Sequence, residues 1–239
     1  MHSTLLPVVA WLVGLLTAGA PPGRPQYEPA AKETVEQAQE RYQGIAEAIA
    51  TVAYDAAEEP VEGNRRFTAA LMAAVAYHES GFRRDVDLGI GRARLAASGW
   101  NDSGRSWCLM QINLGRKDLD KETADRLSAE KGFAVTMDSA LKTREGWTGL
   151  ELLQDREKCF RAGLHVLKGA VGVCHHLGRL DWLRSYASGN CSDGANESAL
   201  RMGTAIRWGR SAKNNWNDAE IMRSLNVESQ VVLGFVVAE

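Results

Sequence analysis

The chain has 239 residues, of which 45% are apolar and 24% are charged. This composition is that of an ordinary globular protein and excludes a disordered or fibrous one. The formal net charge is -2, and without a long basic stripe we expect no nucleic acid among the partners.

The first 20 residues predict a secretory signal peptide. Leu5 to Leu16 is an apolar run too short for a comfortable membrane span, and small residues follow it up to Ala20. No Lys or Arg precedes the run, so a retained anchor and a plain N-terminal segment stay open as alternatives. We expect cleavage after Ala20, export to the periplasm or the extracellular space, and no integral membrane segment in the processed chain.

Apolar residues at three- and four-residue steps predict helices over most of the chain. Residues 21–60 combine a Pro- and Gly-rich linker with a helix from about 31 to 59. A second helix is expected over 66–80, and Gly81 ends it. The polar, Gly-rich segment 83–105 is long enough to be a loop at an active site.

The second half of the chain continues the helical pattern. Residues 106–114 are a compact apolar segment, and a short charged helix is expected over 118–131. An apolar stripe predicts the longest helix over 150–177, in the centre of the domain. Further helices are expected at 181–186 and 197–210.

Few segments carry a strand pattern, so the predicted fold class is mainly α. Residues 61–212 form the expected main domain, and residues 213–239 form a C-terminal tail. We expect the protein to be a monomer.

The four cysteines, Cys108, Cys159, Cys174 and Cys191, predict two disulfides in an exported chain. Cys159 and Cys174 lie on one predicted helix, about 22 Å apart, which is too far for a bond. Two pairings remain, and we favour Cys108 with Cys159 and Cys174 with Cys191, because the second closes only a short segment. Four free thiols in a cytoplasmic protein are the alternative.

Glu79 is the candidate for acid–base chemistry. It ends an apolar helix at the edge of the buried stripe, where loss of hydration and the negative end of the helix dipole both favour a protonated carboxyl group. A carboxylic acid that keeps its proton near neutral pH is what protonation of a glycosidic oxygen requires. A solvated carboxylate at a helix end is the alternative.

Glu79 opens the first of three short blocks, Glu-Ser-Gly-Phe at 79–82, Trp-Cys-Leu-Met-Gln-Ile-Asn at 107–113 and Ser-Tyr-Ala-Ser-Gly at 185–189. In this order they resemble the lytic transglycosylases of the soluble-lytic-transglycosylase, lysozyme-like family. That family has a Glu-Ser-x-Phe block with the catalytic acid, a Gly-Leu-Met-Gln-Ile block lining the cleft, and an Ala-Tyr-Asn-x-Gly block. Two positions differ, because Cys108 stands where the family has Gly and Ala187 stands where it has Asn.

The resemblance, which covers about residues 66–210, implies a lysozyme-like helical domain with a long central helix and an active-site cleft. It implies that Glu79 alone, as acid and then base, cleaves the β-1,4 bond between N-acetylmuramic acid and N-acetylglucosamine in peptidoglycan and leaves a 1,6-anhydro product. It implies no metal and no organic cofactor. The residues expected to bind the glycan strands are Ser80, Leu109, Met110, Gln111 and Tyr186.

Two other functions stay open. A lysozyme-type hydrolase would need a second carboxylate, and the candidates Asp85, Asp87 and Asp102 are expected to be solvated or capping residues. A non-catalytic protein that binds envelope glycan on the same fold is the other alternative, and the substitution at Ala187 leaves it open.

Overall fold

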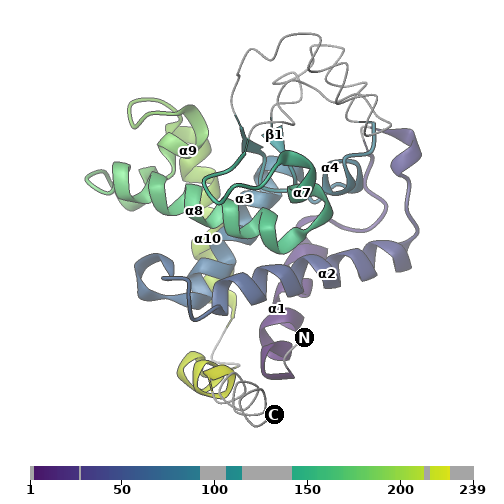
Figure 1. The fold of residues 1–239 in the computed structure, drawn as a ribbon, viewed down its shortest axis with the longest axis horizontal. Coiled ribbons are helices and arrows are strands. Elements are labelled where there is room, and N and C mark those ends of the chain that lie inside the picture. The colour runs from purple at the N-terminus through teal and green to yellow at the C-terminus, as the bar shows by residue number, and fades with distance from the viewer. Residues whose placement is uncertain (1–2, 27, 92–105, 115–141, 213–215, 227–239) are drawn as a thin grey trace, which may run out of the picture.

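The computed structural model describes residues 3–26, 28–91, 106–114, 142–212 and 216–226, and over these the chain is mainly helical (Figure 1). The predicted mainly α class is confirmed, whereas the helix expected at 118–131 lies outside the described residues. In chain order the helices are α1 (Leu6–Gly19), α2 (Val35–Tyr54), α3 (Arg65–Ser80), α4 (Arg84–Leu88), α7 (Gly149–Gln154), α8 (Arg156–Cys174), α9 (Arg184–Ser188) and α10 (Ala195–Ser211). Short 3-10 helices span Ser3–Leu5, Pro29–Ala31, Val61–Gly63 and Arg179–Asp181, and β1 (Ser106–Trp107) pairs antiparallel with β2 (Ile112–Asn113).

The centre of the fold is α3, not the helix that the sequence pattern favours. Every residue from Phe67 to Ala76 is buried, and α10 runs along α3. Many of these residues are alanines, which let neighbouring helices approach closely. The expectation that α8 is the central helix is wrong, because α8 exposes Val166 and Val173 on its outer side.

The predicted helix over 150–177 is two helices. Asp155 has extended backbone angles (φ -136°, ψ 105°) and its side chain accepts a hydrogen bond from the Lys158 backbone N–H. Asp155 therefore caps the start of α8 and separates it from α7. At the other end α8 stops at Cys174, three residues before the expected end at residue 177.

The N-terminal apolar segment forms α1 and packs into the core beside α2 and α3. Its buried face comprises Val8, Val9, Leu12 and Leu16. The hydroxyl group of Tyr42 on α2 donates a hydrogen bond to the Ala20 carbonyl at 2.6 Å. Among the described helices, none is long and apolar enough to cross a membrane. Whether this segment is cleaved stays a prediction, but in this structure it is part of the core.

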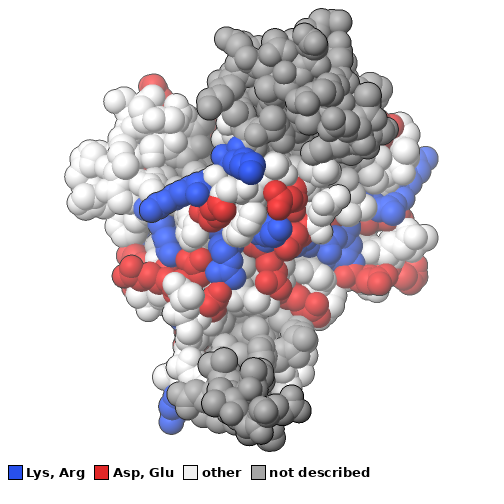
Figure 2. Space-filling model, in the orientation of Figure 1, with Lys and Arg blue, Asp and Glu red and all other residues white. Residues whose placement is uncertain are grey.

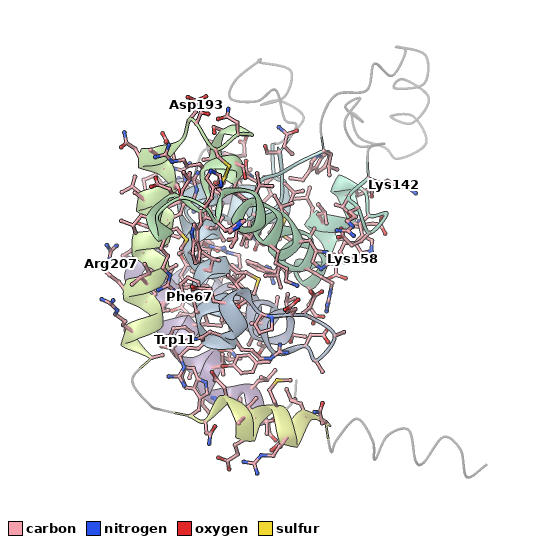
Figure 3. The ribbon with its side chains drawn as sticks, turned by 90° about the vertical axis from the view of Figure 1, so that its left-hand side faces the viewer. Trp11, Phe67, Lys142, Lys158, Asp193 and Arg207 are labelled. Carbon is pink, nitrogen blue, oxygen red and sulfur yellow. A yellow bond between two sulfur atoms is a disulfide. The ribbon has the colours of Figure 1, made fainter. Side chains whose placement is uncertain are left out.

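Within the described part of the C-terminal tail, residues 216–226, Trp216 lies against Trp11 of α1. The rings of Trp216 and Trp11 lie 5.4 Å apart, and Figure 3 shows Trp11 close to the tail helix at residues 218–226. Trp216 also donates a hydrogen bond to the hydroxyl group of Tyr54, and the Arg66 guanidinium lies over its ring. Residues from both ends of the chain therefore share one contact region.

Both predicted disulfides are present, with the favoured pairing. Cys108 bonds to Cys159, and Cys174 bonds to Cys191, with Cα atoms 6.1 and 5.6 Å apart. The first bond joins the β1–β2 hairpin to α8, and the second joins the end of α8 to the segment after α9. The two bonds therefore attach near opposite ends of α8, the first close to its start and the second at its last residue.

Acidic and basic side chains are interspersed in a band across one face of the molecule (Figure 2). Glu58 is the centre of one such cluster, and its carboxylate accepts hydrogen bonds from Arg161, His165 and Lys168 of α8. The other ring nitrogen of His165 contacts Glu145. This network ties the turn after α2 and the segment before α7 to the outer side of α8.

Candidate active site

A cavity of about 640 Å³ opens where the C-terminal end of α3 meets the β1–β2 hairpin, α9 and α10. It contains the candidate acid Glu79 together with Gln111 and Tyr186, which come from the second and third sequence blocks. The blocks are far apart in the sequence, and the end of α3, the hairpin and α9 bring them together around this cavity. The remaining lining residues are Ser106, Ile112, Asn113, Val166, Ser185, Ala187, Ser188, Gly189 and Arg201.

Glu79 is held on a rigid support. It lies in the last turn of α3, directly after ten consecutive buried residues and Tyr77-His78. Gly81, with a φ of 58°, ends the helix in a left-handed conformation that glycine adopts without strain. The Glu79 side chain is 18% exposed, so it is partly shielded from water, as the helix pattern predicts.

Arg201 of α10 is the residue that sequence reasoning missed. Its Nε and Nη2 atoms donate hydrogen bonds to a single oxygen of Glu79, Oε1, at 2.9 and 2.6 Å. Only 11% of the Arg201 side chain is exposed. A signal was present in the sequence, because Arg201 falls on the helical stripe of the buried residues Ser198, Met202 and Ala205. A guanidinium on a buried stripe needs an anionic partner.

Tyr186 of α9 presents a neutral hydroxyl group near Glu79. Its hydroxyl donates a hydrogen bond to the backbone carbonyl of Met110 at 2.5 Å. Burial raises the pKa of Tyr186 well above its usual value, and the negative charge of Glu79 raises it further. The phenol therefore stays protonated, and it links α9 to the hairpin.

In the hairpin turn, the side chain of Gln111 lines the cavity, whereas the side chains of the two residues before it lie in the core. Leu109 and Met110 are fully buried, so these two predicted binding residues do not line the cavity with their side chains. Gln111 lines it, while its side-chain amide also donates to the Cys108 carbonyl at 2.9 Å. Met110 packs so closely on Gly163 of α8 that a Cβ atom there would lie 2.8 Å from Met110 Cγ.

Cys108 adopts a φ of 55°, in the left-handed region. A glycine is favoured at such a position, and the resembling family has Gly there. In this chain the disulfide to Cys159 holds the strained residue in place. The substitution at Cys108 is therefore compatible with the same turn geometry.

Ser80 supports the helix end and does not reach the cavity. Its hydroxyl group donates to the Ala76 carbonyl at 2.6 Å and accepts from the Phe82 backbone N–H at 3.2 Å. Ser80, which was expected to bind the glycan, is therefore a local cap of the helix end. Ala187 does line the cavity, so the position where the family has Asn is at the site.

The candidate second carboxylates lie elsewhere. Asp85 and Asp87 are buried in and around α4, which occupies the start of the predicted 83–105 loop. Asp87 pairs with Arg156 at 2.7 Å, and Asp85 accepts a hydrogen bond from the Glu28 backbone N–H. Of the two expected roles, solvated or capping, the solvated one does not hold, because both side chains are buried. Asp85 accepts hydrogen bonds from two backbone N–H groups, and Asp87 pairs with Arg156, so both hold α4 against its neighbours. Asp102 lies outside the described residues.

His78, the neighbour of Glu79, contacts Thr204 of α10 at 3.0 Å. Burial lowers the pKa of His78, and the positive charges of Arg201 and Arg207 lower it further. The imidazole is therefore neutral at pH 7.

Within the described ranges, no group of three or more His, Cys, Asp or Glu side chains is placed to hold a metal ion. Comparison of the chain with protein-family models, curated proteins and solved structures finds no match.

Proposed function

We propose that this protein is a lytic transglycosylase of lysozyme-like fold that cleaves the glycan strands of peptidoglycan. The observation that carries the proposal is the meeting of Glu79, Gln111 and Tyr186 in one cavity. Each comes from a different one of the three blocks that resemble the family. The neutral polar side chains that line the cavity can also form hydrogen bonds with a glycan.

In the proposed reaction, Glu79 acts first as an acid. It donates a proton to the oxygen that links N-acetylmuramic acid to N-acetylglucosamine, and that glycosidic bond breaks. The resulting carboxylate then takes the proton from the 6-hydroxyl group of the muramic acid residue, whose oxygen attacks the anomeric carbon. The products are a 1,6-anhydro-muramic acid end and a free 4-hydroxyl group on N-acetylglucosamine.

The presence of one carboxylate among the described cavity residues supports this lyase reaction over hydrolysis. Glycoside hydrolases generally use two carboxyl groups, about 5–5.5 Å apart in retaining enzymes and about 6.5–9.5 Å apart in inverting ones. Among the described residues that line the cavity, Glu79 is the only carboxylate. Asp85 and Asp87 have structural partners of their own.

The proposal includes export, because peptidoglycan lies outside the cytoplasmic membrane. The two disulfides support it, since such bonds form and persist in oxidising compartments. The expected location is therefore the periplasm or the extracellular space. The expected partner is the glycan strand, bound by a monomer.

One observation favours the alternative of a non-catalytic glycan-binding protein. Arg201 holds Glu79 in an ion pair, and a carboxylate in an ion pair has no proton to donate. A protein that only binds glycan would use this pair as a fixed polar wall. Catalysis requires that the pair opens.

Product analysis separates these functions. The full-length protein is incubated with purified peptidoglycan, and the soluble fragments are identified by mass spectrometry. Fragments with 1,6-anhydro-muramic acid ends are the expected result. Fragments with reducing muramic acid ends would indicate a hydrolase, and binding without soluble fragments would indicate the non-catalytic protein.

A further inference from the structure

In the ion pair between Glu79 and Arg201, both hydrogen bonds go to the same oxygen of the Glu79 carboxylate. Both donors of Arg201 go to Oε1, and within the described residues no hydrogen bond reaches Oε2. Arg201 also lines the cavity, so a ligand that enters it can reach the guanidinium. A planar guanidinium binds a carboxylate best through two parallel hydrogen bonds, one to each oxygen. A carboxylate that binds Arg201 through both of its oxygens can therefore displace Glu79 from this pair.

The charges of the cavity make that replacement depend on a proton. Glu79 and Arg201 are the only charged side chains among the described lining residues, and together they sum to zero. If Glu79 takes up a proton, the cavity carries one positive charge and favours an anion. By thermodynamic linkage, an anion bound to Arg201 in turn favours the protonated form of Glu79.

We propose that Arg201 recognises a carboxylate of the glycan substrate, and that this exchange of partners releases Glu79 as the acid. The proposal rests on the proposed function, and it names the substrate class as an N-acetylhexosamine polymer that carries carboxylates. The peptide stem of peptidoglycan supplies such groups, and so does the lactyl ether of a muramic acid residue that carries no stem. A neutral polymer of the same linkage lacks them, so it leaves the pair closed and Glu79 without its proton. The proton that Glu79 gains comes from solvent water.

The first test compares native peptidoglycan with peptidoglycan whose carboxylates have been converted to methylamides. The full-length protein is expected to cleave the native polymer at least about tenfold faster, because a charge-assisted pair is lost in the amide. Arg201→Gln is expected to cleave both forms within about threefold of each other. Arg201→Lys, which keeps the charge but not the planar fork, is expected to show an intermediate preference.

Arg207→Gln is the matched control. Arg207 is on the same helix but exposed, and Figure 3 shows it on the outer side of α10. This variant is expected to keep the full preference for the native polymer. An Arg201→Gln variant that also keeps it would overturn the proposal, as would a wild-type protein with no preference.

A binding experiment tests the exchange even if no glycan is cleaved. The probe is muramyl dipeptide, with its methylamide as the neutral counterpart, and calorimetry with the full-length protein measures affinity. Glu79→Gln removes the competing carboxylate and is expected to bind muramyl dipeptide at least about fivefold more tightly than wild type, whereas Arg201→Lys binds it more weakly than wild type.

These experiments distinguish failure of the proposed activity from failure of the proposed exchange of partners. Absence of cleavage with the expected pattern of affinities would refute the proposed activity but keep Arg201 as the carboxylate site. Equal affinity of wild type and Glu79→Gln for muramyl dipeptide would overturn the exchange, whatever the activity. Wild-type binding is also expected to take up protons, which heats measured in two buffers of different ionisation enthalpy detect.

Discussion

The Tyr186 hydroxyl donates a hydrogen bond to the Met110 carbonyl, which joins two sequence blocks that lie 76 residues apart. The bond fixes the position of the hairpin turn from which Gln111 enters the cavity. A side chain that faces the candidate acid is thus also a structural tie between α9 and the hairpin.

Tyr186→Phe tests that double role. Removing the hydroxyl is expected to lower the free energy of unfolding by about 1 kcal/mol, the net value of one hydrogen bond. It is also expected to reduce the rate of glycan cleavage, because the hairpin with Gln111 loses its anchor. Urea unfolding and a rate assay on peptidoglycan measure the two effects.

Tyr42→Phe is the matched control for this substitution. Tyr42 also donates to a backbone carbonyl, that of Ala20, but it does not line the cavity. It is expected to lose a similar free energy of unfolding and to keep full activity. Equal loss of activity in both variants would mean that Tyr186 acts only through stability.

The two disulfides are expected to differ in their effect on activity. The bond between Cys108 and Cys159 closes 51 residues and that between Cys174 and Cys191 closes 17. From loop entropy, their removal is expected to cost about 4 and about 3 kcal/mol of unfolding free energy, respectively. Only the first bond holds the hairpin of the cavity. Replacing both its cysteines by Ser is therefore expected to lower activity at a temperature where both variants remain folded, and equal activities would contradict this role.

The signal-peptide prediction and the packing of α1 lead to different expectations for the chain without residues 1–20. A signal peptide would be dispensable for folding, whereas a helix packed in the core would not. Removing residues 1–20 removes the buried side chains of Val8, Val9, Leu12 and Leu16. At about 1.5–3 kcal/mol each, these side chains contribute an amount comparable to the whole stability of a domain. Residues 21–239 alone are therefore expected to lose cooperative thermal unfolding, as measured by circular dichroism.

A pair of single substitutions checks the same point in the full-length chain. Leu12→Ala is expected to lower the unfolding free energy by about 2–5 kcal/mol, because Leu12 is fully buried. Leu6→Ala, at a residue that is 49% exposed, is expected to have little effect. If residues 21–239 melt as the full chain does, α1 is dispensable, as a cleaved signal peptide would be.

Glu58 gives the protein a defined sensitivity to acid. Burial raises the pKa of Glu58, but hydrogen bonds from Lys168, Arg161 and His165 outweigh it, so the net pKa is lowered from 4.5. A carboxyl group with a lowered pKa in the folded state stabilises the fold above its unfolded pKa, and that contribution is lost as the pH falls through the folded pKa. Glu58→Gln is expected to flatten the fall in stability below about pH 4.5, where urea midpoints measure it. An unchanged slope would contradict the pairing.

The sequence predicted the site residues whose positions depend on a helix end or on a short sequence block. Glu79 was found because the stripe of α3 and Gly81 define where the helix ends, and Tyr186 and Gln111 were found through short blocks. Leu109 and Met110 belong to the same block, but the pattern did not show that their side chains turn into the core. The direction of a side chain in a tight turn depends on backbone angles that an apolar run does not reveal.

The sequence alone could not predict ion pairs between residues that lie far apart in the chain. Arg201 meets Glu79 across 122 residues, and Asp87 meets Arg156 across 69, so neither pairing follows from helical spacing. The composition of α1 does not distinguish a signal peptide from a buried helix, because an apolar run is typical of both. The break at Asp155 was missed since one polar residue does not interrupt the apolar stripe.

The most direct test of the central claim is the rate at which the full-length protein releases soluble glycan from peptidoglycan, compared with its Glu79→Gln variant. The variant must be shown by circular dichroism to be folded, with both disulfides intact. We predict that the loss of the acid lowers the rate by roughly a thousandfold, within the usual range for general acid–base catalysis. A folded Glu79→Gln variant that cleaves at the wild-type rate would contradict the account.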